Sequence, residues 1–212
     1  MLSLASSDQP CFKPQLRDYF LKFSSFENEG WKFSYYLDNT EITSEYWGCS
    51  RSSIPSTAGI WLAVDGFHAQ VRHLFLAHSA SELLCFCQYY SNWLDSSTVV
   101  AFAALGLLPS YQQLNFLYAQ FPNAKVHTVF GTEVTGKVMD CKVALWLGKT
   151  ESTFEVRDEL VKFNYRGKSF SIAECSFSLS QFEKTTALRS AIRTHKPKGG
   201  FMSYQELFMS AF

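Results

Sequence analysis

The sequence lacks the signatures of membrane, secreted and zinc-binding proteins. No apolar run approaches the roughly 20 residues needed to span a bilayer. The start of the chain has neither the basic segment nor the continuous apolar stretch of a secretory signal. None of the six cysteines forms a C-x-x-C pair, which excludes zinc-knuckle and thioredoxin-like sites. We therefore expect a cytoplasmic protein without membrane association.

An excess of charge of either sign is also missing. Lysine plus arginine and aspartate plus glutamate both total 19, so the net charge is zero. Nothing global attracts such a chain to phosphate backbones or anionic membranes. A nucleic-acid partner would need a local basic patch.

The cysteines lie mostly in apolar surroundings and are expected to be reduced, mostly buried thiols. They are Cys11, Cys49, Cys85, Cys87, Cys141 and Cys175.

Aromatic and aliphatic residues are abundant. The 212 residues include 20 Phe and 5 Trp, and 47% of them are hydrophobic, so burial can offset the conformational entropy lost on folding. This length suits one domain. A helix is predicted to begin near Pro14, followed by β-rich runs between residues 31 and 64. We expect residues 1–66 to form this helix and β-rich lead-in, packed on a main α/β domain of residues 67–212.

Residues 72–148 alternate apolar strands with amphipathic helices three times. The strands are predicted over residues 72–77, 98–103 and 126–130, and the helices over residues 79–94, 110–121 and 137–147. Such alternation is typical of a mostly parallel central sheet flanked by crossover helices.

A hairpin and two helices are predicted beyond residue 150. The hairpin covers residues 159–172 and turns at Arg166-Gly167. The helices lie near residues 180–194 and 203–211, where Ser180-x-x-Glu183 and Ser203-x-x-Glu206 have the pattern of capping boxes.

The segments that directly follow the three strands indicate a family. Ligands of open parallel sheets collect at these strand ends, which here are residues 78–82, 104–106 and 131–136. Their order and spacing resemble those of the Toprim family of primases, topoisomerases and related nucleases, in particular stand-alone primase-like proteins of bacterial mobile elements. The resemblance covers about residues 60–150 and implies a Toprim-like Rossmannoid fold.

The motif positions depart from the family pattern. The family has a Glu after the first strand, which acts as general acid or base, and Asp-x-Asp after the third, which helps to bind magnesium. This chain has His78 at the Glu position, Gly131 at the first Asp position and Glu133 at the second. Glu133 alone would bind magnesium weakly. We therefore expect a catalytically inactive module with no bound cofactor.

Two further carboxylates are candidates for the same site. Asp140 lies about two turns into the third helix, and its carboxylate would help only if the helix turned it inward. Ser79-x-x-Glu82 is also a capping box, which explains Glu82 without a catalytic role. His78 is expected to be hydrogen bonded in its loop, and a general-base role for it stays open.

Two histidines and two glycines have a structural explanation. His73 and His127, inside apolar strands, are expected to be hydrogen bonded rather than to bind ligands. Gly106 and Gly136 are expected to permit close backbone approaches at strand-to-helix turns.

A basic run near the C-terminus is the candidate nucleic-acid surface. Its members are Arg189, Arg193, His195, Lys196 and Lys198, with Phe201 and Tyr204 close by. Charge next to aromatic rings can follow a phosphate backbone, but cations also suit the solvated end of a helix.

Three functions stay open. The first is an inactive Toprim-like module for nucleic-acid-associated or protein-binding work, accessory to mobile-element DNA replication or transfer. The second is an active magnesium-dependent nucleotidyl or phosphodiester-processing enzyme that uses Glu133, Glu82 and a displaced carboxylate. The third is an interaction scaffold whose surface is the aromatic-rich segment 31–62. DNA, RNA or another protein is the expected partner.

Overall fold

A five-stranded mixed sheet forms the centre of the molecule in a computed structural model, which describes residues 12–27, 29–48, 51–94 and 98–211. The strand order is β12-β8-β6-β7-β5, and only β5 runs antiparallel to its neighbour. The strands are β5 (Trp61–Val64), β6 (His73–Ala77), β7 (Val100–Ala104), β8 (Lys125–Thr128) and β12 (Arg193–Thr194). The predicted α/β class with a mostly parallel sheet is confirmed.

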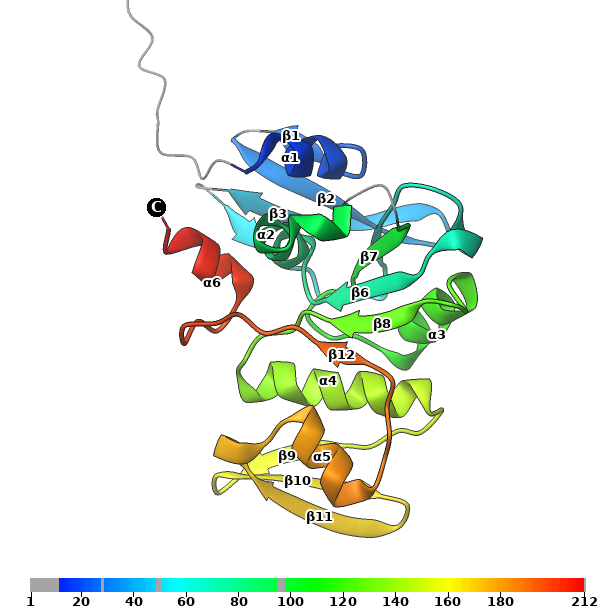
Figure 1. Ribbon diagram of the computed structural model, residues 1–212, viewed down its shortest axis with the longest axis vertical. Coiled ribbons are helices and arrows are strands. Elements are labelled where there is room, and N and C mark those ends of the chain that lie inside the picture. Colours follow the sequence, from blue (N-terminus) through cyan, green and yellow to red (C-terminus); the bar gives the residue numbers. More distant parts are fainter. Residues whose placement is uncertain (1–11, 28, 49–50, 95–97, 212) are drawn as a thin grey trace, which may run out of the picture.

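Helices cover both faces of this sheet (Figure 1). Alternate strand residues point to opposite faces, so Phe75 and Phe102 pack towards one set of helices and Leu74 and Leu76 towards the other. The first set is α1 (Pro14–Phe20), α2 (Ala80–Tyr89) and α6 (Tyr204–Met209), and the second is α3 (Tyr111–Gln120) and α4 (Val134–Leu147). Short 3-10 turns lie at His68–Gln70, Ser91–Leu94 and Glu174–Ser176.

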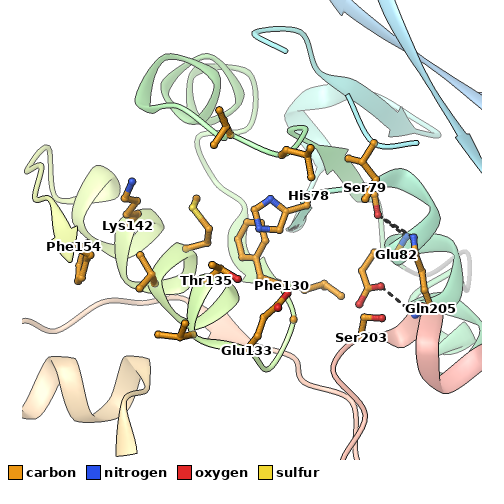
Figure 2. A pocket seen from close by; sticks show the side chains of 18 of the residues that line it. His78, Ser79, Glu82, Phe130, Glu133, Thr135, Lys142, Phe154, Ser203 and Gln205 are labelled. Carbon is orange, nitrogen blue, oxygen red and sulfur yellow. Dashed lines mark hydrogen bonds between the residues drawn. The ribbon is translucent and has the colours of Figure 1, made fainter. Parts of the chain in front are cut away.

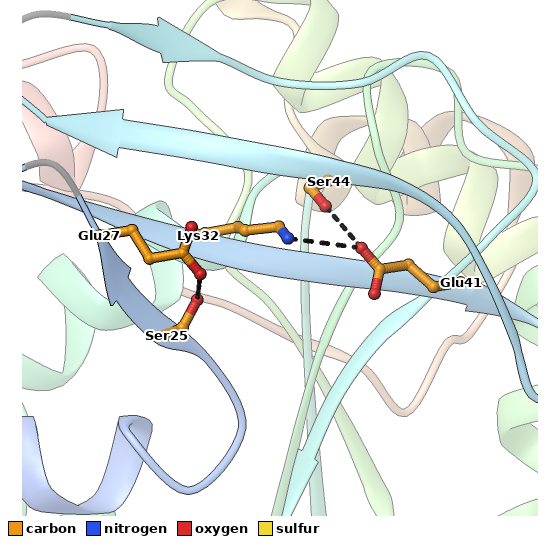
Figure 3. Close-up of polar contacts among 5 residues, drawn as sticks. All are labelled: Ser25, Glu27, Lys32, Glu41 and Ser44. Atoms are coloured by element: carbon orange, nitrogen blue, oxygen red, sulfur yellow. Dashed lines mark hydrogen bonds and ion pairs between the residues drawn. The ribbon is translucent and has the colours of Figure 1, made fainter.

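An antiparallel sheet precedes the central one in the chain. It contains β1 (Ser25–Glu27), β2 (Gly30–Leu37), β3 (Thr40–Gly48) and β4 (Ser52–Ser53), in that order. Trp31, Phe33 and Tyr35 alternate along β2 and are buried in the core shared with α2. Polar side chains lie on the other face, where Glu41 accepts a hydrogen bond from Ser44 (2.9 Å) and pairs with Lys32 (Figure 3). Tyr36 of β2 and Ile42 of β3 are also exposed (48% and 44%). The rings of Trp31, Phe33, Tyr35 and Trp61 are therefore core, so the aromatic surface suggested for segment 31–62 is limited to side chains such as Tyr36.

A second antiparallel sheet follows α4. It contains β9 (Phe154–Arg157), β10 (Leu160–Tyr165) and β11 (Lys168–Ala173), and it packs with α5 (Leu179–Thr186) and with Cys141 and Leu145 of α4. The predicted turn at Arg166-Gly167 is present, with φ of 50° and 75°. Strand β9 was not predicted, because its four residues contain only two apolar side chains.

The predicted helix over residues 180–194 is wrong in its second half. Helix α5 ends at Thr186, Ala187 is left-handed (φ 56°), and Arg193 and Thr194 then pair with β8. The capping box at Ser180 is also wrong, because Ser178 is the N-cap and accepts the Gln181 N–H (3.2 Å). Pairing with the open edge of β8 has overridden local helix propensity.

The expectations for the cysteines and for membrane-spanning helices can be compared with the structure. Cys85, Cys87 and Cys141 are free and buried, whereas Cys175 is free and exposed; Cys11 and Cys49 lie outside the described residues. Within the described part of the chain, every helix is too short or too polar to cross a membrane.

Candidate functional site

A cavity of about 530 Å³ opens at the carboxyl edge of the parallel strands (Figure 2). His78, Gly131 and Glu133 line it, as does Glu82 from the first turn of α2. Much of the remaining wall is apolar, including Leu108 and Met139. The structure thus brings together four of the five residues predicted for the site. Asp140, the fifth, does not line the cavity.

His78 is fixed in the loop after β6. Its Nδ1 donates to the carbonyl oxygen of Gly106 (3.0 Å), and its ring packs against Phe130 (centroids 4.7 Å apart). Burial lowers the pKa of the imidazole, and the hydrogen bond to Gly106 and the nearby Glu133 carboxylate only partly oppose this. The ring is therefore neutral at pH 7, and the proton on Nδ1 leaves Nε2 as the acceptor nitrogen. The expected loop hydrogen bond is present.

Glu82 does not complete the predicted capping box. Ser79 caps α2 as expected, because its hydroxyl accepts the Glu82 N–H (3.1 Å). The Glu82 carboxylate instead accepts the N–H groups of Tyr204 (2.7 Å) and Gln205 (3.1 Å), at the start of α6. Burial nevertheless raises the pKa of Glu82 to about 7. The Glu82 carboxylate joins α2 to the start of α6, and both of its oxygens already accept hydrogen bonds.

Glu45 is a buried carboxylate that sequence reasoning missed. It lies in β3, and its oxygens accept the N–H groups of Ala80 (2.8 Å) and Ser81 (2.9 Å) at the N-terminus of α2. The hydroxyl of Tyr35 donates to the same carboxylate (2.8 Å). An anion suits this end of a helix, although burial raises its pKa. Nothing in the local pattern of β3 distinguishes Glu45, because the N–H groups of α2 that it accepts lie 35 and 36 residues away.

Residues 195–203, which we call the C-terminal strap, run over the loop that contains Gly131. The Thr132 N–H donates to the Met202 carbonyl (2.9 Å), and the Thr132 hydroxyl donates to Phe201 (3.2 Å). A Cβ atom on Gly131 would lie 2.9 Å from the Met202 oxygen. Position 131, which the resemblance aligned with the family's first aspartate, therefore has no room for a side chain unless the strap moves.

Lys196 of the strap binds at the same strand end. Its Nζ donates to the carbonyl oxygens of Phe130 (2.9 Å) and Gly131 (2.8 Å) and pairs with Asp140 Oδ2 (2.7 Å). Asp140 is 1% exposed, and burial raises its pKa against the opposing effect of Lys196. The side chain of Asp140 is turned inward, as it would have to be to contribute to the predicted site, but it contacts the Lys196 ammonium and does not line the cavity. All three N–H donors of Lys196 are used inside the protein, whereas Arg189, Arg193 and Lys198 are exposed.

Three histidines form a hydrogen-bonded chain across neighbouring strands. His73 Nδ1 lies 2.9 Å from His127 Nε2, and His127 Nδ1 lies 2.8 Å from His195 Nε2. The three rings lie among aromatic side chains such as Phe75 and Trp93. Burial lowers the pKa of His127 to about 3 and that of His195 to about 4. His73 and His127 are thus hydrogen bonded, as expected for core histidines.

Both strand-end glycines permit the expected close approaches. Gly106 has φ of 79°, and a Cβ atom there would lie 2.7 Å from the Pro55 oxygen. A Cβ atom on Gly136 would lie 2.3 Å from the Gly131 oxygen. Substitution at either position would therefore force the backbone to shift.

The residues present do not fit a magnesium ion. Both Glu82 oxygens accept peptide N–H groups, and the carbonyls of Phe130 and Gly131 accept from Lys196. Glu133 is the remaining carboxylate of the motif, and a hard dication needs about six oxygen ligands. Among the described residues, no group of three or more His, Cys, Asp or Glu side chains is arranged to hold a metal ion.

Comparisons with protein-family models, with curated proteins and with solved structures find no match to this chain.

Proposed function

We propose that this chain is a catalytically inactive Toprim-like module that works by binding a partner. Support for the Toprim-like part comes from the three strand–helix units β6–α2, β7–α3 and β8–α4, which follow the family order. Their strands are adjacent and parallel, so the three motif segments meet at one edge. The finer family assignment rests on this order and on the motif residues.

The position of Lys196 carries the proposal of inactivity. Its ammonium takes two backbone carbonyls and one carboxylate at the end of β8, the place where the family pattern would hold a cation. An internal cation there repels a dication, and it occupies oxygens that the dication would need. The chain's own tail thus takes over a structural role of the metal.

The cavity wall favours a protein over a nucleic acid as the partner. Leu107 and Leu108 are 49% and 72% exposed at its rim. Exposed apolar clusters of this kind are typical of protein-binding surfaces. Nucleic-acid binding is the second candidate, and it rests on the exposed Arg189, Arg193 and Lys198. Lys196 does not belong to that surface, because its ammonium pairs with the buried Asp140 and donates to two backbone carbonyls.

Calorimetric titration with Mn²⁺ tests the proposal. We expect no saturable binding by the unmodified chain, and the Glu133→Ala variant should give the same trace. Micromolar binding that Glu133→Ala abolishes would show an active-type metal site and would contradict the proposal.

Restoring the family residues with His78→Glu and Gly131→Asp is a weaker test. The new side chain at position 131 would meet the Met202 carbonyl, so a failure to gain metal binding would not be informative. The titration of the unmodified chain avoids this problem.

A further inference from the structure

Strand β9 leaves one edge of the C-terminal sheet unpaired. It is the last strand in the order β11-β10-β9, and three of its four residues are exposed. Unpaired strand edges present a row of free N–H and C=O groups that can pair with another chain. Most edges of this kind are protected by charge or by their short length, so the side chains of β9 decide whether it can pair.

The hairpin geometry shows which backbone groups face outward. Arg157 pairs with Leu160 across the two-residue loop Asp158-Glu159, whose φ values are 54° and 60°. In such a hairpin the closing pair exchanges both hydrogen bonds, and the next pair exchanges none. The N–H and C=O of Val156 therefore point away from β10, towards the open edge. The same alternation turns the backbone groups of Phe154 outward.

The side chains along this edge are self-complementary. Glu155 and Arg157 flank Val156 symmetrically and lie on the opposite face of the strand from it. In an antiparallel pair of two β9 strands with Val156 on the two-fold axis, Glu155 of each copy lies opposite Arg157 of the other. Opposite charges at facing positions stabilise a strand pair. The Arg157–Asp158 ion pair within one copy is 3.5 Å long and highly exposed, so it competes weakly.

Val156 adds an apolar contact on the inner face of the same strand. Its side chain is 45% exposed and, with Phe154, lines the end of the cavity beside α4. Facing residues of a hydrogen-bonded antiparallel pair have Cα atoms about 5.5 Å apart, so the two Val156 side chains would cover each other.

We infer that the chain forms a two-fold symmetric dimer by antiparallel pairing of β9 with β9 of a second copy, centred on Val156. The reciprocal Val156 hydrogen bonds set the register, and two Glu155–Arg157 pairs stabilise it. Such an interface is closed and isologous, so it ends at two copies. The inference goes beyond the proposed function and does not depend on it.

Charge exchange at the two flanking positions tests this register by sedimentation of the full chain over a range of concentrations. Glu155→Arg alone and Arg157→Glu alone each place like charges opposite one another, and each should weaken the dimer about tenfold or more. An equimolar mixture of the two variants should dimerise again, because every facing pair is then of opposite charge.

Two further variants serve as controls for folding and for surface. Val156→Pro removes the outward N–H but no bond to β10, so it should leave the circular dichroism unchanged and abolish the dimer. Lys168→Glu changes an exposed charge on β11, the far strand of the same sheet, and should leave the dimer intact. An unmodified chain that stays monomeric at all concentrations would overturn the inference. So would single charge variants that dimerise as well as the unmodified chain.

Discussion

At the scale of single residues, the Lys196–Asp140 pair makes the clearest energetic prediction. Lys196→Met keeps the length of the side chain but leaves the buried Asp140 without its cation, and we expect a loss of roughly 3 kcal/mol in the free energy of unfolding. Adding Asp140→Asn should recover part of this loss, because the lone charge is then removed. Urea unfolding measures both changes.

Lys198→Met is the matched control for this pair. Lys198 is two residues away and exposed, so its substitution should change stability by no more than about 0.5 kcal/mol. If Lys196→Met cost as little as Lys198→Met, the internal ammonium would have no structural role.

From the sequence, a residue could be placed at the site only where it directly follows one of the predicted parallel strands. His78, Gly131 and Glu133 could be placed together from the sequence because the ends of parallel strands share an edge. Glu45 and Lys196 could not, since they come from a different sheet and from the tail. Glu82 was found at the site, but its partner in α6 lies 122 residues away. The contacts that decide the chemistry of the site are thus long-range and leave no local pattern.

At the scale of elements, the histidine chain links β6 and β8 to the residue after β12 and makes their association sensitive to pH. The folded-state pKa values of about 3 for His127 and about 4 for His195 lie below the ordinary value of 6.5. The unfolded chain therefore binds protons that the folded chain does not as the pH falls below 6.5. The stabilisation is present above that pH and decreases towards pH 4, by at most about 1.4 kcal/mol per pH unit for each ring.

A comparison of variants isolates this effect. His127→Gln should reduce the fall in the free energy of unfolding between pH 6.5 and pH 4, whereas His68→Gln, at an exposed site, should not. The raised pKa of Glu82 makes the free energy of unfolding rise as the pH falls, which is opposite to the effect of the histidines. Because Glu82 is present in the unmodified chain and in both variants, its effect cancels when a variant is compared with the unmodified chain. Equal slopes for His127→Gln and the unmodified chain would contradict the role assigned to the chain.

Elements with strong periodicity were predictable, and short strands were not. The three helices after β6, β7 and β8 appear where apolar spacing placed them, with shifts of a few residues at their ends. Strands β9 and β12 were missed, because runs of four and two residues are too short to be distinguished from loop sequence. Both exist through pairing with a neighbouring strand, which is a tertiary effect that local sequence does not encode.

At the scale of the whole molecule, the path of the tail determines what the central sheet can do. After the C-terminal sheet the chain returns to add β12 beside β8, crosses the carboxyl edge as the strap, and ends in α6 against α2 (Figure 1). The central sheet is mixed and mostly parallel, and the strap crosses its carboxyl edge at Gly131 and Thr132. The sequence showed that carboxylates are few at this edge, but not that Lys196 would contact Asp140 and two backbone carbonyls there.

A crystal soaked in Mn²⁺ and measured for anomalous scattering tests this central claim most directly. We expect no manganese peak at the carboxyl edge of β6 and β8, and density for Lys196 Nζ between Asp140 and the carbonyls of Phe130 and Gly131. A manganese peak bound by Glu133 and the Gly131 carbonyl, with Lys196 displaced, would contradict it.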